Sequence, residues 1–373
     1  MRYVAPATLL SFLPFGIATA QSTWTVDRNP ILDVPGVAAD GKVNFGYAAG
    51  ATRLADGTLL VADRAESAVR VIDASGRVVR TLGRAGQGPN EFASIVWAGG
   101  CGNDTLLVWD LGRRQASMVG ANGIGRQFTV PAGDTAQMPY QFSCARNRTM
   151  AYVSAPRPDR SATTTSIPNV QAALAAVYRV NSEGAVVQRL GTHPGGEVLL
   201  LTSPGGGRGG APRPLGRAAY VAAVTDAIVI SSADSAQVTV VPANGPSRVI
   251  KLAVTLRAPT RAEYDAAVQA TASMVPAPMR QTMTSQLAAS PMPERLPPVS
   301  ALFSDPAGLL WVQTSPPGAS AIDLLVMQLD GHLVARVRIP RAVTIHEIGN
   351  DYIVAGYADA NDEPHVAVFG LKR

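Results

Sequence analysis

The chain has few charged residues, few aromatic rings and few cysteines. Asp, Glu, Lys and Arg make up only 16% of its 373 residues, whereas about 25% is usual in globular proteins. Hydrophobic residues make up 47%, which excludes disorder over most of the length and provides for a sizeable core. The two cysteines are too few for a disulfide-rich scaffold or for a zinc cluster held by cysteines.

Lysine is nearly absent, since only Lys42, Lys251 and Lys372 are present, and arginine therefore supplies most of the positive charge. The net charge is +5, and no basic run is longer than a pair such as Arg113-Arg114. Binding to nucleic acid requires a basic stripe or a recognisable module. The sequence has neither, so we expect no nucleic-acid partner.

Common catalytic motifs are also missing. No G-x-S-x-G occurs, so nothing indicates a serine hydrolase. His346-Glu347 lacks the second histidine of H-E-x-x-H and lies in a predicted strand, which excludes a metalloprotease helix. The glycine-rich stretch Gly205–Gly210 is not followed by G-K-[ST], which excludes a phosphate-binding loop.

The first residues have the pattern of an export signal. Arg2 supplies one positive charge, Val4–Ile17 is almost wholly apolar, and Ala18-Thr19-Ala20 matches an A-x-A cleavage site. The apolar run is too short for a membrane span, and no later segment has the roughly 18 apolar residues that a spanning helix needs. We expect a signal peptide over residues 1–20, the alternative being a buried helix. We also expect no transmembrane segment and a monomeric mature domain over residues 21–373, periplasmic or secreted.

Short apolar runs with a period of two recur along the mature chain. The first four begin at Ala51, Thr58, Ala68 and Arg77, with turn residues such as Asp56-Gly57 between them. A meander of four strands that repeats about every 35 residues or more is typical of a β-propeller, in which each sheet forms one blade. Further copies are predicted over Ile95–Val130, Gln141–Gly191, Ala218–Leu252 and Val299–Ile339.

The last copy, Val343–Leu371, has only three predicted strands, whereas Thr23–Asp33 forms an unpaired predicted strand before the first copy. Pairing these segments closes the ring and protects a sheet edge. The sequence therefore predicts an all-β fold, a six-bladed β-propeller of four-stranded antiparallel blades whose last blade is closed by the N-terminal strand.

A helical insert is predicted between blades four and five, at about residues 258–292. Thr260 and Glu263 form a capping box, and good helix formers follow over Tyr264–Met274. A second helix is predicted over Met279–Ala289, with Met279, Met283 and Leu287 on one face. Packing of this face onto the host is favoured, and a ligand or partner surface is the alternative.

Two segments carry a resemblance to a known family. Asp56–Asp63, followed by Gly86-Gln-Gly-Pro-Asn-Glu-Phe92, resembles an NHL repeat and the exported bacterial six-bladed propellers that have a G-x-G-P-x-E-F motif. Asp305–Val312 is similar to the D-x-x-G-x-L-W-V strand of the same group. Glu66-Ser67-Ala68 departs from the Asn-His-Arg of an NHL repeat. The resemblance implies the fold. The departure at residues 66–68 weakens any transfer of partner-binding roles to this chain.

The two cysteines lie at equivalent places in successive repeats. Cys101 and Cys144 each precede a turn that leads into a strand, so in a propeller they would be neighbours. An exported chain meets an oxidising compartment. We expect a Cys101–Cys144 disulfide, the alternative being two buried free thiols.

The long connections of the predicted propeller share one face. Links between strands two and three and passages between blades lie there, and they include the expected loops Arg84–Phe92, Thr192–Arg217 and Ala358–Pro364. Loops on a rigid scaffold commonly carry binding residues. We expect a small molecule or a protein partner to bind this long-loop face, with an anionic group held by adjacent arginines. The candidate ligand-binding residues are Arg113, Arg114, Asp110, Asp63 and Glu91.

Metal binding is the weaker possibility. Asp359, Asp362 and His365 could hold a hard cation such as Ca²⁺, but their spacing matches no known metal loop and a solvated acidic loop is favoured. We therefore expect no metal, no catalytic residue and no cofactor. The favoured function is an exported, non-catalytic binding or scaffold propeller. The alternative is a metal-dependent lactonase- or lyase-like enzyme with a site on the axis, where His346 and Glu347 are the suitable side chains.

Overall fold

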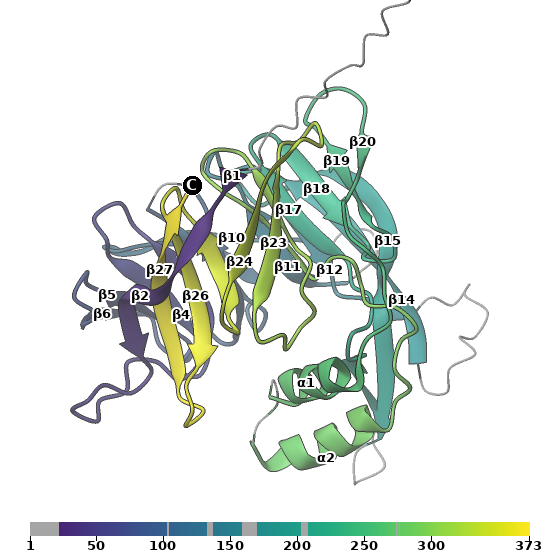
Figure 1. Ribbon diagram of the computed structural model, residues 1–373. Coiled ribbons are helices and arrows are strands. Elements are labelled where there is room, and N and C mark those ends of the chain that lie inside the picture. The colour runs from purple at the N-terminus through teal and green to yellow at the C-terminus, as the bar shows by residue number, and fades with distance from the viewer. Residues whose placement is uncertain are drawn as a thin grey trace, which may run out of the picture.

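The computed structural model describes residues 22–373 apart from 103, 133–136, 159–169, 203–207, 274 and 276. The expected signal peptide, residues 1–20, lies outside the described residues. The regular secondary structure of the described residues is almost wholly β-strand, which confirms the all-β prediction (Figure 1). No helix in the described part of the chain has the length and apolar character to cross a membrane.

Strand pairing among the described residues gives six sheets, almost wholly antiparallel. The first sheet contains β3 (Ala48–Arg53), β4 (Leu59–Asp63), β5 (Ala68–Ile72) and β6 (Val78–Leu82). The second contains β7 (Ile95–Gly100), β8 (Leu106–Asp110), β9 (Gln115–Gly120) and β10 (Gly123–Thr129). The third contains β11 (Pro139–Cys144), β12 (Met150–Ser154), β14 (Val170–Val180), β15 (Val186–Thr202) and β16 (Arg208–Pro212), with β13 (Arg157–Pro158) paired to β14.

The other three sheets come from the second half of the chain and from its N-terminal segment. The fourth contains β17 (Tyr220–Val224), β18 (Ala227–Ser231), β19 (Gln237–Val241) and β20 (Arg248–Lys251). The fifth contains β21 (Ala301–Ser304), β22 (Leu310–Gln313), β23 (Ile322–Met327), β24 (Leu333–Ile339) and β1 (Ser22–Thr23). The sixth contains β25 (Thr344–Ile348), β26 (Tyr352–Ala358), β27 (Pro364–Lys372) and β2 (Thr25–Pro35).

The first strands of successive sheets contact each other in a closed cycle. They meet in the order β3, β7, β11, β17, β21, β25 and back to β3. The second strands β4, β8, β12 and β18 are buried along their whole length, because each packs between two neighbouring sheets. The core consists of clusters between adjacent sheets, such as the one that joins Leu60 to Val108. This arrangement is a β-propeller, as the repeats predict.

The N-terminal segment joins the end of the chain. As predicted, β2 pairs with β27, from Thr25 opposite Lys372 to Pro35 opposite His365. A second contact was not predicted: β1 pairs in parallel with β24 of the fifth sheet. Between β1 and β2, the ring of Trp24 lies 5.7 Å from that of Trp311. The segment therefore holds two sheets together.

The predicted disulfide is present between Cys101 and Cys144. Cys101 follows β7 and Cys144 ends β11, so the bond joins the first strands of the second and third sheets. Neither cysteine is free.

Two helices, α1 (Arg261–Ala272) and α2 (Ala277–Ala288), lie in the chain between β20 and β21. The predicted capping box of Thr260 and Glu263 begins α1. The helices pack on the end of the long β14–β15 pair that contains Val170 and Leu199, and Figure 1 shows them beside it. Leu287 is fully buried there. Met279 is exposed, so only part of the expected apolar face packs on the host.

The expected loop over residues 192–217 is wrong in its first part. β15 continues as a strand to Thr202 and stays paired with β14 as far as Leu199. The pairing register of β14 and β15 shifts at three places, and Gly191 and Gly196 in β15 adopt positive φ. Pro194-Gly195-Gly196 looked like a turn because glycine and proline commonly mark one, but long-range pairing with β14 holds this stretch extended.

Candidate functional site: the central channel

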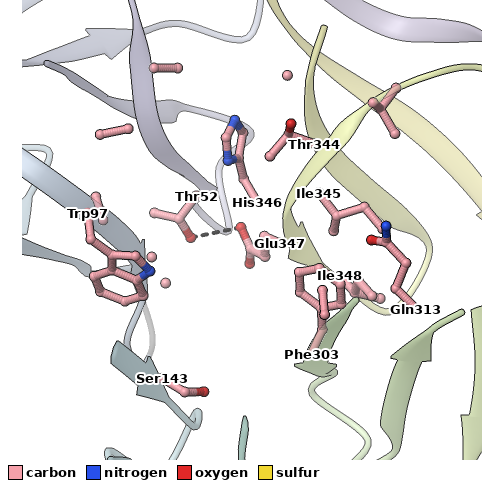
Figure 2. A pocket seen from close by; sticks show the side chains of 18 of the residues that line it. Thr52, Trp97, Ser143, Phe303, Gln313, Thr344, Ile345, His346, Glu347 and Ile348 are labelled. Carbon is pink, nitrogen blue, oxygen red and sulfur yellow. Dashed lines mark hydrogen bonds between the residues drawn. The ribbon is translucent and has the colours of Figure 1, made fainter. Parts of the chain in front are cut away.

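A cavity of about 1080 Å³ runs along the axis of the ring. The first strands of all six sheets line it, because in each sheet the innermost strand faces the axis. Figure 2 shows part of this wall. One side chain from each strand illustrates the lining: Thr52, Trp97, Ser143, Val221, Phe303 and Glu347.

Glu347 lies on this wall, and hydrogen bonds hold both oxygens of its carboxylate. Its Oε2 accepts from Thr52 Oγ1 at 2.8 Å and from the backbone N–H of Arg53 at 2.7 Å. Its Oε1 accepts from the Tyr352 hydroxyl at 3.1 Å. Burial raises the pKa of Glu347, although these hydrogen bonds lower it in part. The carboxylate thus joins the first sheet to the last across the closure of the ring.

His346 precedes Glu347 at an irregularity in β25. The pairing register with β26 shifts between Ile345 and Glu347, and a bulge of this kind re-aims side chains. The Nε2 atom of His346 is buried and has no hydrogen-bond partner. A Cβ at Gly356 would lie 2.8 Å from this nitrogen, so the ring needs a glycine there. Burial lowers the pKa of His346 to about 4, and the imidazole is therefore neutral at pH 7.

Aromatic rings and an arginine complete the middle of the channel. Trp97, Phe303 and Tyr352 all line it. The Arg53 guanidinium lies over the Tyr352 ring, 4.9 Å from its centroid. It forms no ion pair with Glu347. The channel can therefore offer a ligand aromatic faces, a buried carboxylate and a neutral imidazole.

Two of the predicted binding residues, Asp63 and Asp110, end second strands, where the links to the third strands begin. The buried carboxylate of Asp63 accepts from the backbone N–H groups of Gly46, Tyr47 and Ala65, and it pairs with Arg70 at 3.2 Å. Asp110 occupies the equivalent place in the second sheet. It accepts from the N–H groups of Ala93, Ser94 and Arg113. Each aspartate thus binds the segment through which the chain enters its sheet to the link between the second and third strands of that sheet.

Glu91 and Arg113 hold the loop that carries the G-x-G-P-x-E-F motif. Glu91 accepts from the Gly88 N–H and from Arg84, each at 2.7 Å. Arg113 donates to the carbonyl oxygens of Gly88 and Glu91 at 3.0 and 2.6 Å. Arg114 is exposed, with φ of 55°. The structure thus brings Asp110, Arg113 and Glu91 together and leaves Asp63 in another sheet. Ligand binding by these residues stays a prediction.

The predicted metal candidates group differently from the expectation. Asp359, Glu363 and His365 bring ligand atoms within 4.8 Å of one another, so Glu363 takes the place expected for Asp362. One oxygen of Asp359 already accepts from the N–H groups of Asn361 and Glu363. His365 Nδ1 lies 2.9 Å from Asp33. The expectation of no metal, with calcium as the weaker possibility, stays a prediction.

Sequence reasoning identified His346 and Glu347 only as candidates of the enzyme alternative, and it missed Thr52, Trp97 and Tyr352. A signal for Thr52 and Trp97 was available, since both belong to first strands and these face the axis of a propeller. For Tyr352, which begins a second strand, the sequence contained no such signal.

No family model matches the chain, and no curated protein matches it. The resemblance to NHL repeats therefore stays a prediction. Among solved structures, a member of the DUF4221 family from Bacteroides vulgatus matches with a TM-score of 0.52 at 8% identity, over 95% of this chain and 100% of that one. A putative exported protein from Bacteroides fragilis matches at 0.46 and 11%, over 96% and 97%.

Virginiamycin B lyase from Staphylococcus aureus matches with a TM-score of 0.41 at 12% identity, over 94% of this chain and 99% of that one. At such identities a likeness concerns the fold alone. The match to the DUF4221 member concerns a shared fold over the length of both chains, and the strand pairing, with the first strands of the sheets in a closed cycle, is that of a β-propeller.

Proposed function

We propose that this chain is an exported, six-bladed β-propeller that binds a small molecule in its central channel. The observation that carries the proposal is the cavity of about 1080 Å³ lined by the first strands of all six sheets. Ligand pockets commonly have volumes of about 300–1,000 Å³ and combine apolar walls with a few polar groups. Glu347, His346 and Thr52 are the polar groups here.

Six blades are supported by the six sheets and by the cyclic contacts of their first strands. In this proposal β2 completes the sixth blade, the helices form an insert between blades four and five, and residues 21–373 form one monomeric domain. Export to the periplasm or the medium rests on the signal sequence over residues 1–20.

Entry from the long-loop face is part of the proposal. Tyr47, Arg64, Pro317 and Tyr357 line the cavity, and they lie in or beside passages between sheets and links between second and third strands. The ligand would therefore pass the loops that the sequence predicts as the binding face. Binding is favoured over metal-dependent catalysis because the group of three potential metal ligands found among the described residues lies at the β26–β27 link, away from Glu347.

A channel-filling variant tests the proposal. Thr344 is exposed and lines the cavity, so Thr344→Trp should narrow the channel with little loss of stability. The control is Val79→Trp, at an exposed position on the outer strand β6. Thermal-shift screening against a panel of sugars, amino acids, amines and carboxylic acids should give hits with the unaltered protein and the control that vanish in Thr344→Trp. Hits that persist in Thr344→Trp would place binding elsewhere.

A further inference from the structure

The second inference concerns the chemistry of the channel ligand and rests on the proposed function. We propose that this ligand carries an organic cation, an ammonium group that lies against the carboxylate of Glu347. Four observations support this placement: the neutral donors around the carboxylate, the missing counter-ion, the aromatic walls and the open space in front of them.

The carboxylate of Glu347 is held by neutral donors alone. These are the Thr52 hydroxyl, the backbone N–H of Arg53 and the Tyr352 hydroxyl. A carboxylate has about four acceptor sites, and three are used. Because Glu347 also lines the cavity, the remaining site on Oε1 is available to a ligand.

No cationic side chain in the described part of the chain forms an ion pair with Glu347. Arg53, whose charge lowers the pKa of Glu347, stacks on Tyr352 instead. A buried charge without a partner is costly, so buried carboxylates are normally paired, protonated or solvated. A cation in the channel would supply the missing counter-charge.

The walls around Glu347 are suited to a cation. Figure 2 shows Trp97, Phe303 and Glu347 in the same open part of the channel. Aromatic faces attract ammonium groups through the ring quadrupole, and tryptophan does so most strongly. A carboxylate together with aromatic rings is the composition by which proteins recognise amines and quaternary ammonium groups.

The role of Glu347 could instead be purely structural, because its hydrogen bonds to Thr52 and Arg53 join β25 to the first sheet. A glutamine at this position keeps these hydrogen bonds between the sheets. Its carbonyl oxygen can accept from Thr52 and Arg53, and its amide can donate to the Tyr352 oxygen. Glu347→Gln therefore removes the charge and keeps the hydrogen bonds, which separates the two roles.

The experiment uses three probes of nearly equal shape: choline, its uncharged analogue 3,3-dimethylbutan-1-ol, and the anion 3,3-dimethylbutanoate. Binding to the mature protein is measured by calorimetry and by ligand-observed NMR at about pH 8, because a raised pKa makes the ionisation of Glu347 more complete at higher pH. The variants are Glu347→Gln and Thr344→Trp. The control is Glu183→Gln, at an exposed position in the β14–β15 turn.

We expect choline to bind the unaltered protein and Glu183→Gln at least about tenfold more tightly than the alcohol. Glu347→Gln should keep its melting temperature and lose most of this preference. Equal or tighter binding of the alcohol or the anion, no binding of choline, or a preference that survives in Glu347→Gln would overturn the inference.

If Glu347→Gln does not fold, the unaltered protein and Thr344→Trp decide: a preference for choline that Thr344→Trp abolishes supports the inference, and a missing preference overturns it. Failure here is distinguishable from failure of channel binding. If the alcohol or the anion binds and Thr344→Trp blocks it, the channel is a ligand site and only the cation is wrong.

Discussion

The guanidinium of Arg373 donates a hydrogen bond of 2.7 Å to Oδ2 of Asp305, on the β21–β22 turn. Trp311 Nε1 donates to the same oxygen at 3.0 Å, and Asp305 is fully buried at its side chain. Arg373 also lies over the ring of Trp24, 4.8 Å from its centroid. The end of the chain, the N-terminal segment and the fifth sheet therefore meet around one carboxylate.

Replacing Arg373 with Ala should lower the free energy of unfolding by about 1–3 kcal/mol, because it leaves a buried carboxylate with a single side-chain donor. Urea denaturation measures the loss. The control is Lys372→Ala, since Lys372 pairs with Asp27 at an exposed site and such pairs contribute about 0–1 kcal/mol. Equal effects of the two changes would show that the Asp305 contact is unimportant.

Removing Thr23–Asp33 should cost several kcal/mol of stability and reduce solubility, because β27 becomes an exposed edge and Trp24 no longer packs on Trp311. Melting temperature and sedimentation check this. Ile31→Ala, at an exposed position within the same strand, should change little. A truncated protein as stable and soluble as the full one would contradict closure by this strand.

The Cys101–Cys144 bond closes a loop of 43 residues, which is worth roughly 4 kcal/mol in the chain-entropy model. Changing both cysteines to Ser should lower stability by an amount of that order in oxidising buffer. With reductant present, the variant and the unaltered protein should unfold alike. Two free thiols in exported material, measured by mass spectrometry, would show that the bond does not form.

Arg113 and Arg114 should differ in their effect on stability. Arg113→Ala removes two hydrogen bonds to the loop over residues 84–92 and should cost about 1–2 kcal/mol. Arg114→Ala changes an exposed side chain and should stay within about 0.5 kcal/mol. If Arg114→Ala alone weakened ligand binding, the predicted role of the long-loop face would be supported. Equal stabilities of the two variants would contradict the structural role of Arg113.

His346 should make stability depend on pH. The pKa of His346 is about 4 in the folded protein, whereas 6.5 is the ordinary value of a histidine, so the unfolded chain takes up the proton first as the pH falls. This contribution is complete above about pH 6.5 and is lost as the pH falls toward about 4. His346→Gln should flatten the fall in unfolding free energy over this window, and His332→Gln, at an exposed site, serves as control. Identical pH profiles for all three proteins would contradict burial of a neutral imidazole.

The sequence alone determined the features that depend on near neighbours. Period-two apolar runs and turns such as Asp56-Gly57 specify the strands, because alternation places one face of each strand in the core and glycine allows the positive φ of the turn. The capping box of Thr260 and Glu263 specifies the start of α1 in the same local way. The repeat length then indicates a propeller, and in it the two cysteines occupy equivalent places.

Only the tertiary structure decided what lies on the axis. Thr52 and Glu347 are 295 residues apart and meet because the ring closes between β3 and β25. The register shift beside His346 and the space over Gly356 place its ring, and neither can be derived from alternation, which assumes regular pairing. The same reason explains Asp63 and Asp110. Their residue type suggested ligand binding, but their bonding is set by backbone N–H groups from other links, which no local pattern contains.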